Sequence, residues 1–448
     1  MNSGTRRSDL GRLVGLLARR RFWPLFAVQF GGALNDNVLR NAIVAMVAFG
    51  SIAGDAAPGE KALLIQAAVA LFMLPFLLFS PAAGMLADSC PDRAVAVRWI
   101  KSGEIATASL AACGLFMQSM PLLLVALFLS GLQSALFGPF KYSLLPVILR
   151  RDELLGGNSL QSASTYVAIL IGVVWGTHLG ASEPEPTATA AVIIGIAVAG
   201  FAASLMMLRL PWPESPGWKA ALRINPATAV VAVVRKVAAL RGILTLVLLS
   251  SWFWVSGSLV LIQLPVLVRD SLGFDHGVYL LLLMVVCLGV AAGSLAASLT
   301  LKGQVSLRHV AVAIAVASAA LLLPVWPPAA PAGEAAGLDA FFASGHAGSV
   351  AIMLAVLSAA MGFYIVPIYA AMQAWVPEAA RGQTIAANNV FNALFIATGA
   401  TAAGLFVENF AAIGTGTYWL FVIVGVAGLA VAVWALLKLP GLERQLAN

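Results

Sequence analysis

Charged residues are scarce in this chain of 448 residues: Asp, Glu, Lys and Arg make up 10% of it, while hydrophobic residues make up 61%. A typical soluble domain is roughly 45–50% apolar and about 25% charged. A soluble core cannot hide so much apolar surface, and disorder requires low hydrophobicity and high charge. The shortage of charge, with a mean hydropathy of +0.94, therefore excludes a soluble enzyme and a disordered chain, and predicts a polytopic membrane protein.

Cysteine and the common catalytic motifs are scarce as well. Cys90, Cys113 and Cys287 are too few and too scattered for a disulfide framework or a zinc site. The absence of a phosphate-binding loop, GxxxxGK(S/T), excludes a primary ATP-driven pump. No cluster of His, Cys and carboxylate side chains has the spacing of metal ligands, and no Ser/His/Asp set shares a common depth. We therefore expect a protein that is not an enzyme and that holds no metal or organic cofactor.

The basic segment 1–21 lacks the short apolar region and cleavage site of a secretory signal, so we expect it to be retained. Its leucines and Val14 recur at helical spacing among arginines. This pattern favours a helix lying on an anionic membrane surface, with a solvated basic tail as the alternative. The net charge of +7 does not indicate nucleic-acid binding, because most of the basic residues lie in the termini and loops that flank the expected membrane spans.

Apolar runs between charges and Pro or Gly breaks predict twelve membrane-spanning helices. Two six-helix bundles at 22–208 and 242–438 are expected, joined by a cytoplasmic linker at 209–241 and followed by a cytoplasmic tail at 439–448. The expected spans are 22–50, 62–87, 94–118, 121–149, 157–180, 187–208, 242–268, 277–300, 306–325, 349–375, 382–407 and 413–437.

The basic residues predict the orientation, because cytoplasmic loops carry an excess of Lys and Arg. Of the 26 Lys and Arg residues, 22 fall in alternate segments that include both termini and the linker. Only Lys61 and Arg269 fall in the opposite segments, and Arg40 and Lys141 lie inside spans. Both termini are therefore expected in the cytoplasm.

The two halves resemble each other in sequence. The segment 157–160 matches 382–385, and the polar runs 161–165 and 388–392 follow two residues out of step. A period of about 225 residues, with both copies entering from the cytoplasm, predicts parallel six-helix repeats. This all-α arrangement of 12 transmembrane helices resembles the major facilitator superfamily, which implies alternating access and a substrate site between the two halves.

Polar and ionisable groups stand inside several spans, where they usually face an internal cavity. One anionic and at least one cationic group in such a cavity would match a zwitterion. Alternatively, Asp36 and Arg40 pair within one helix, and the amides of spans five and eleven only join neighbouring helices. The candidate substrate-binding residues are Gln29, Asp36, Asn37, Arg40, Lys141, Tyr142, Asn158, Gln161, Thr165, Gln263, Asn388, Asn389 and Asn392.

Other polar and aromatic residues have simpler expected roles. Glu104 is expected to pair with Lys101 or Arg98 near the cytoplasmic end of span three, and Trp252 and Trp254 to be interfacial anchors.

The loop after span two resembles the superfamily motif Gly-x-x-x-Asp-(Arg/Lys)-x-Gly-(Arg/Lys). Gly84, Asp88 and Arg93 fit this motif, and Ser89 stands where it has a base. The resemblance implies a gating motif, with close helix approach at Gly84 and a helix cap from Asp88. The gating salt bridge of the motif is not carried over, because its base is missing.

Several segments together resemble bacterial lysophospholipid transporters of the LplT type. The segments are QFGGALNDNVLRNAI, LADS, FGPFKYSLLP, LLGGNSLQSASTYVAILIG, SWFWVSGSLVLIQLP and AANNVFNALF, and the resemblance runs from about Phe22 to Leu437. It is closest to the transporter domain that is often fused to a 2-acylglycerophosphoethanolamine acyltransferase and acyl-carrier-protein synthetase. Because the chain ends at Asn448, we expect no fused acyltransferase.

The resemblance implies inward movement of lysophospholipids, mainly lysophosphatidylethanolamine, across the bacterial inner membrane for reacylation. Asp36 with Arg40 or Lys141 would complement the ammonium and phosphate of the head group in a central polar cavity. The acyl chain would stay in an apolar lateral groove, because wetting it costs about 0.8 kcal/mol per CH2. A separate lysophospholipid acyltransferase on the cytoplasmic side is a possible partner.

Two other classes remain open from the residues alone: an efflux antiporter for amphipathic drugs or small solutes on the same fold, and a non-transporting scaffold. A lone carboxylate in an apolar pocket would favour the antiporter, whereas Asp36 has polar neighbours. We expect a monomer among membrane lipids, with a coupling cation, Na+ or H+, near Asp36.

Overall fold

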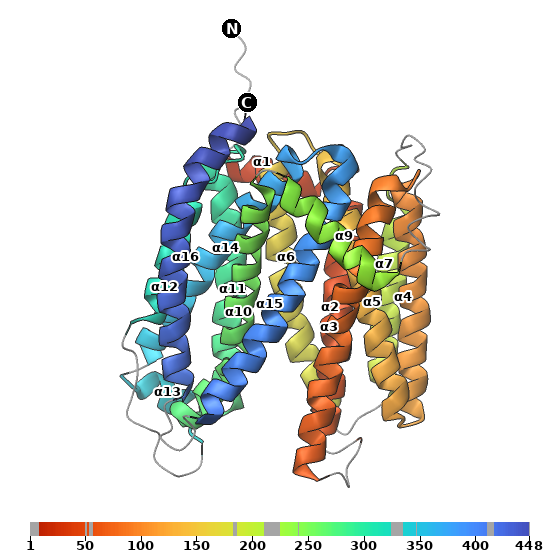
Figure 1. Cartoon of the computed structure of the whole chain (residues 1–448). Helices are drawn as coiled ribbons and strands as arrows, with labels where there is room; N and C mark the ends of the chain where they lie inside the picture. The colour runs from red at the N-terminus through yellow and green to blue at the C-terminus, as the bar shows by residue number, and fades with distance from the viewer. Residues whose placement is uncertain are drawn as a thin grey trace. The chain divides into compact units, whose positions relative to one another are not determined.

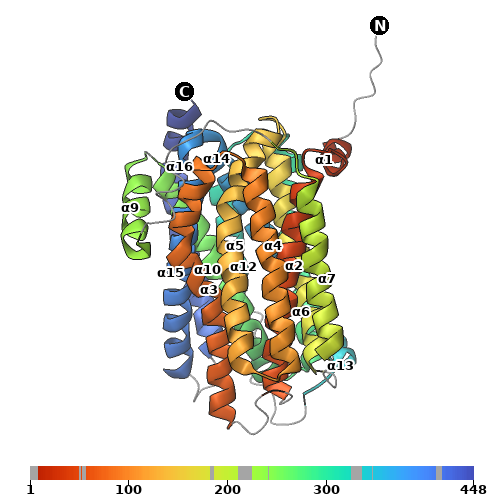
Figure 2. The same cartoon turned by 90° about the vertical axis from the view of Figure 1, so that its right-hand side faces the viewer.

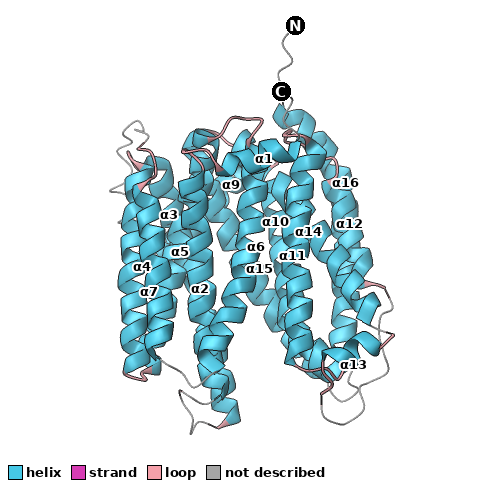
Figure 3. Cartoon of the chain, turned by 180° about the vertical axis from the view of Figure 1, so that it is seen from behind, coloured by secondary structure: helices cyan, strands magenta, loops and turns pink. Residues whose placement is uncertain are grey.

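The long apolar runs fold as helices, because a lipid-exposed backbone must satisfy its hydrogen bonds within its own segment. The computed structural model describes residues 9–49, 52, 57–181, 186–209, 225–240, 242–323, 335–345, 347–409 and 416–447. Helices dominate these residues, and an isolated β-bridge joins Phe274 to Ala336. Figure 1 shows the helices in chain order, and Figure 3 shows them coloured by type of structure.

The helices before residue 240 are α1 (Asp9–Leu17), α2 (Trp23–Phe49), α3 (Pro58–Ser89), α4 (Arg93–Phe116), α5 (Met120–Ile148), α6 (Leu154–Ala181), α7 (Pro186–Leu205) and α9 (Pro226–Ala239). The later elements are α10 (Ile243–Val266), a π-helical turn (Leu267–Ser271), α11 (His276–Leu301), α12 (Val310–Leu321), α13 (Leu338–Ala343), α14 (Ala347–Trp375), a 3-10 turn (Glu378–Ala380), α15 (Arg381–Asn409) and α16 (Gly416–Ala447).

Membrane spans account for twelve of these helices. Within the described chain, α3, α5, α6, α7, α10, α11, α14, α15 and α16 are long and apolar enough to cross a bilayer. α2 and α4 are 27 and 24 residues long but carry ionisable groups, and α12 has 12 described residues. The multi-pass fold of twelve spans that the sequence predicts is therefore confirmed.

Two compact units divide the chain. The first holds the described residues up to Gly157, those within Val167–Arg241, and Met372–Ala393. The second holds Asn158–Tyr166, Gly242–Ala371 and the described residues from Leu394 onward. The units therefore differ from the expected bundles at 22–208 and 242–438, because α6 and α15 each contribute residues to both.

Small residues bring α6 close to α2 in the first unit. Gly172, Gly176 and Gly180 lie four residues apart, and a Cβ atom at Gly172 would lie 3.1 Å from the Leu34 carbonyl oxygen. Small residues at this spacing let two membrane helices approach closely. In the same unit α4 packs against α5 and α7, and α2 packs against α5 and α7 (Figure 2). The polar residues of α2 therefore lie in the interior of a helix bundle.

The expected linker at 209–241 contains a helix that the sequence analysis missed. α9 buries Ala229, Val233 and Val237, which lie four residues apart on one face, and it packs against α3. Pro226 stands at the first position of α9, where its fixed φ favours a helix start instead of a break.

The two ends of the chain also differ from the expectations. Leu13 and Leu16 of α1 are buried, so the alternative of a solvated tail is wrong for Asp9–Leu17. At the other end, α16 continues to Ala447 instead of giving way to a tail at 439. Leu439 and Leu442 are still buried there, so packing continues past the predicted boundary.

Candidate functional site

Asp36 of α2 lies against two serines of α5. The hydroxyl groups of Ser130 and Ser134 both donate hydrogen bonds to its carboxylate, one to each oxygen. The serines are four residues apart and therefore share one face of α5. Two neutral hydroxyls thus hold an anionic group in the interior of the first unit.

Arg40 does not pair with Asp36, although the two are four residues apart. Its guanidinium donates to the Asn37 side-chain oxygen at 2.5 Å and lies 5.3 Å from the centroid of the Phe72 ring. The Asn37 amide in turn donates to the Ala33 carbonyl oxygen at 2.8 Å. The alternative of an Asp36–Arg40 pair within one helix is therefore wrong for this structure.

A buried ion pair lies beside Asp36. Lys101 and Glu104, one turn apart on α4, form a salt bridge and are only 2% and 7% exposed. The Asn35 amide of α2 donates to Glu104 at 3.3 Å, and the Lys101 ammonium lies 5.5 Å from the centre of the Phe137 ring. The expected pairing of Glu104 with Lys101 is confirmed.

The interior position of this pair was not anticipated. A Cβ atom at Gly32 would lie 2.7 Å from the Lys101 ammonium nitrogen, so the absence of a side chain on α2 makes room for the charge. Glu104, expected near the cytoplasmic end of its span, lies midway along α4 (Arg93–Phe116), and Ser130 and Ser134 are not among the expected site residues. The serine spacing of four residues was a signal that could have been used.

Lys141 of α5 is buried and lies over an aromatic ring. Its ammonium nitrogen is 4.2 Å from the Tyr142 ring centroid. In the part of the chain that the structure describes, it makes no ion pair with a carboxylate. About two turns earlier on α5, the Gln133 amide donates to the Thr107 hydroxyl at 2.5 Å, so this amide joins α5 to α4.

The polar face of α15 lies in the first unit. The Asn389 amide donates to the Ser80 hydroxyl of α3 at 3.4 Å and would lie 3.3 Å from a Cβ atom at Gly138 of α5. Asn388 and Asn392 are buried on the same helix. The first unit contains the candidates Gln29, Asp36, Asn37, Arg40, Lys141, Tyr142, Asn388, Asn389 and Asn392.

The remaining candidates lie in the second unit. Asn158 and Gln161 are buried on α6, and the Thr165 hydroxyl donates to the Gln161 carbonyl oxygen at 2.8 Å. Both polar atoms of the Gln161 side chain are buried without a hydrogen-bond partner among the described residues. Gln263 of α10 accepts a hydrogen bond from the Thr417 hydroxyl at 3.2 Å, so its side chain joins α10 to α16.

The second unit also holds an aromatic cluster that sequence analysis missed. The Phe253 ring packs edge-on against Tyr166 at 6.4 Å and Tyr364 at 5.8 Å, measured between ring centroids. Trp254 donates from its indole nitrogen to the Tyr369 hydroxyl at 3.2 Å. Trp254 is thus engaged with α14 within its unit, instead of acting simply as an interfacial anchor.

The motif residues around Asp88 cap α15. One Asp88 oxygen accepts the backbone N–H of Gly382 at 2.6 Å, and the other accepts the backbone and side-chain N–H groups of Gln383 at 3.0 and 3.1 Å. A carboxylate at this position also interacts favourably with the positive end of the helix dipole. The Arg93 guanidinium donates to the Ala87 carbonyl oxygen at 2.7 Å.

Close backbone contact accompanies this cap. A Cβ atom at Gly84 would lie 2.6 Å from the Gly382 carbonyl oxygen, so a side chain there would force α3 and α15 apart. α9 contributes as well, because the Lys236 ammonium donates to the Gln383 side-chain oxygen at 2.9 Å. The Gln383 amide is therefore held at both ends, by α3 and by α9.

Metal-ligating groups do not gather in the described residues: no set of three or more His, Cys, Asp or Glu side chains could hold a metal ion.

This fold and its polar interior define a multi-pass membrane transporter. The sequence profile of the Major Facilitator Superfamily matches residues 25–337, and the chain belongs to that family. The solved structure of the human organic anion transporter MFSD10 (TETRAN) is similar, with a TM-score of 0.72, covering 93% of this chain and 99% of that one at 14% identity. At that identity the likeness concerns the fold alone.

Two lysophospholipid transporters are similar to this chain in sequence. The lysophospholipid transporter LplT of Enterobacter sp. (strain 638) is 27% identical over 355 residues, which cover 78% of each chain. LplT of Serratia proteamaculans (strain 568) is 29% identical over 195 residues, so this chain matches 45% of that relative's length. The resemblance to LplT-type transporters that the sequence motifs indicate is therefore confirmed.

Proposed function

We propose that this protein carries lysophospholipids, mainly lysophosphatidylethanolamine, across the membrane by alternating access. The family indicates a secondary transporter. The identity of its substrate is the new part of the proposal. The similarity to relatives named lysophospholipid transporters supports a lysolipid as the substrate. The charges inside the first unit support a zwitterionic head group.

Asp36 and Lys141 are the observation that carries this proposal. Among the residues that the structure describes, the Asp36 carboxylate is bound by serine hydroxyls and not by a cation, and the Lys141 ammonium faces a ring and not an anion. Charges taken out of water without a partner are costly. A phosphate and an ammonium on one ligand would neutralise both, with the phosphate at Lys141 and the ammonium at Asp36.

The proposed function also specifies the membrane in which the protein lies and the direction of transport. The protein would lie in the bacterial inner membrane with both termini in the cytoplasm and move its substrate inward, toward a lysophospholipid acyltransferase on the cytoplasmic side. A coupling cation, H+ or Na+, would bind near Asp36. The serine hydroxyls add oxygen atoms to the carboxylate, and hard cations bind oxygen ligands.

Reconstituted protein provides the test. Labelled lysophosphatidylethanolamine is added to proteoliposomes, and its protein-dependent movement is compared between wild type, Lys141→Gln and the matched control Lys438→Gln, whose side chain is exposed. Loss of a hydrogen bond to a charged group is worth about 1.5–3 kcal/mol, so Lys141→Gln should bind the lipid roughly 10- to 100-fold more weakly. The control should behave as wild type.

An efflux antiporter for amphipathic drugs is the second candidate, and the absence of a cation bound to Asp36 in the described chain favours it. Competition for a bound fluorescent lysolipid distinguishes the two. A cationic drug-like compound should compete no worse in Lys141→Gln than in wild type if Lys141 binds phosphate. Equal weakening for lipid and drug would assign Lys141 to folding.

A further inference from the structure

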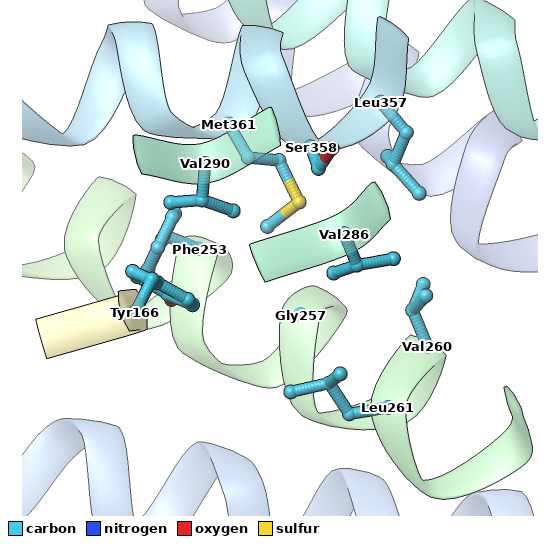
Figure 4. A pocket seen from close by; sticks show the side chains of 10 residues that line it. All are labelled: Tyr166, Phe253, Gly257, Val260, Leu261, Val286, Val290, Leu357, Ser358 and Met361. Atoms are coloured by element: carbon cyan, nitrogen blue, oxygen red, sulfur yellow. The ribbon is translucent and has the colours of Figure 1, made fainter. Parts of the chain in front are cut away.

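The pocket inside the second unit is too small for a lipid chain. Phe253, Val286 and Met361 line it between α10, α11 and α14 (Figure 4). Its free volume is about 20 Å³, and a cavity of roughly 10–15 Å³ holds one water molecule. The pocket therefore has room for a water molecule and not for an alkyl chain. A bound lipid needs a larger contact, such as an exposed helix face.

α1 has an apolar face that the described chain covers only in part. Leu13 and Leu16 are buried at 5% and 3% exposure, whereas Leu10 and Val14 are each 55% exposed. At about 100° per residue, these four side chains fall within one half of the helix, with the exposed pair at one edge. Figures 1 and 2 show α1 at the end of the bundle where α2 begins, lying across the direction of α2. A helix in this position has the geometry of an amphipathic helix in a membrane interface.

Arginines gather where α1 ends. Arg20 and Arg21 are exposed, and among the described residues neither makes an ion pair. The Glu153 carboxylate forms a salt bridge with Arg19, and Nε of Arg150 lies 3.5 Å from the same carboxylate oxygen. One negative charge thus serves two positive charges, and the two exposed arginines add to the excess.

An anionic phospholipid matches both the charge and the apolar edge of this surface. Arg151 and Asp152 follow in the same loop, are both exposed and have opposite charges, so they leave the positive excess unchanged. Arginine binds phosphate through two parallel hydrogen bonds, and basic residues beside an anionic leaflet are attracted to it. A soluble anion would satisfy the arginines but leave Leu10 and Val14 in water, whereas a phospholipid offers phosphate and alkyl chains together.

We propose that α1 and the arginines beside it form a binding surface for anionic phospholipid of the bilayer. Leu10 and Val14 insert among the acyl chains, and Arg20 and Arg21 bind the phosphate groups. The surface is separate from the interior charges of the first unit, so lipid binding here does not depend on which substrate the protein transports.

A fluorophore attached to α1 tests the contact with acyl chains. Leu10→Cys is labelled with bimane in a variant without the three native cysteines. The protein is placed in phosphatidylcholine nanodiscs that contain brominated phosphatidylglycerol or, at the same fraction, brominated phosphatidylcholine, because bromine quenches the label only at close range. The matched control is labelled Arg12→Cys, since position 12 is exposed and lies about 200° around the helix from position 10.

Brominated phosphatidylglycerol should quench the label at position 10 roughly threefold more than the label at position 12, because only the apolar edge enters the membrane. The charge test adds Arg20→Gln/Arg21→Gln to the labelled protein. Each basic residue beside an anionic membrane strengthens the attraction roughly fivefold, so the preference for phosphatidylglycerol over phosphatidylcholine should fall at least that much. Lys302→Gln/Arg308→Gln is the control, because both residues are exposed in the loop after α11, and it should keep the preference.

Three results would overturn the proposal. Equal quenching at positions 10 and 12 would mean that the apolar edge of α1 does not enter the membrane. An unchanged lipid preference in Arg20→Gln/Arg21→Gln would mean that these arginines do not bind the lipid phosphate. Soluble glycerol phosphate, which has no acyl chain, should leave the preference as it is; its loss on addition of glycerol phosphate would assign the arginines to a free anion instead of a lipid surface.

Discussion

Replacing Lys101 by Met tests whether the interior ion pair stabilises the first unit. Removing one partner of a buried pair leaves the other charge uncompensated and costs about 3–5 kcal/mol. Lys101 and Glu104 meet this condition, because they are 2% and 7% exposed. In Lys101→Met the Glu104 carboxylate would keep only the Asn35 amide at 3.3 Å among the contacts seen here, so we expect destabilisation in that range.

The double-mutant cycle isolates the pair. Glu104→Gln alone should also be destabilising, because it leaves the Lys101 ammonium with a neutral amide and the Phe137 ring at 5.5 Å. The double variant Lys101→Met/Glu104→Gln removes both charges and should cost less than the sum of the single changes. We expect a coupling energy of about 2 kcal/mol or more, within the range for residues in contact.

The assay is unfolding in mixed micelles with increasing dodecyl sulfate, followed by tryptophan fluorescence. The comparison pair is Arg150 and Glu153, which are also three residues apart and 3.5 Å from each other; the Arg150 side chain is 74% exposed, while that of Glu153 is 12% exposed and also binds Arg19. Pairs with an exposed partner are worth about 0–1 kcal/mol. A coupling energy at Lys101 and Glu104 no larger than that of this control would refute the reasoning.

Three further predictions follow from the same structure. Asp36→Asn keeps the size of the side chain but removes its charge and one of the two oxygens that accept from Ser130 and Ser134. Lysolipid uptake should therefore fall at least tenfold, about 1.4 kcal/mol, at near-normal membrane expression, and wild-type uptake would make the carboxylate only structural. Lys236→Met removes the hydrogen bond from α9 to Gln383 of α15 and should make nearby Cys90, whose thiol pKa is raised by burial, more accessible. In a variant lacking the other cysteines, its rate of maleimide labelling should rise two- to fivefold. An unchanged rate would mean that α9 does not stabilise the cap. Reporters fused after Arg223 and inserted near Gly337 should read cytoplasmic and periplasmic respectively, and the reverse reading at either site would contradict the proposed orientation.

The membrane fold could be predicted from the sequence because hydropathy is a local property of the chain. A run such as 277–300 is apolar over a bilayer's thickness, and α11 spans His276–Leu301 as a result. The sequence pattern gave wrong helix boundaries at prolines, because a proline can either interrupt a helix or stand within its first turn. Pro226 was interpreted as part of a break and begins α9, and Pro440 was placed beyond the last span but lies within α16.

The candidate site could be predicted only as a set of residue types. Sequence spacing predicts contacts only between residues of the same helix. For Asp36 it therefore indicates Arg40, four residues away, as the partner. The partners in the structure, Ser130 and Ser134, are 94 and 98 residues away. No spacing rule connects residues that far apart on different helices.

Sequence by itself determined that this protein is a helical membrane transporter with charges inside its spans, because composition and periodicity set what each segment can bury. Tertiary structure alone decided which charges are neutralised. Packing of α2, α4 and α5 gives Glu104 a cation, gives Asp36 two hydroxyls and leaves Lys141 over a ring. The reason is physical: a charge inside a low-dielectric bundle is governed by contacts within a few ångströms, and only the packing of separate helices creates those contacts.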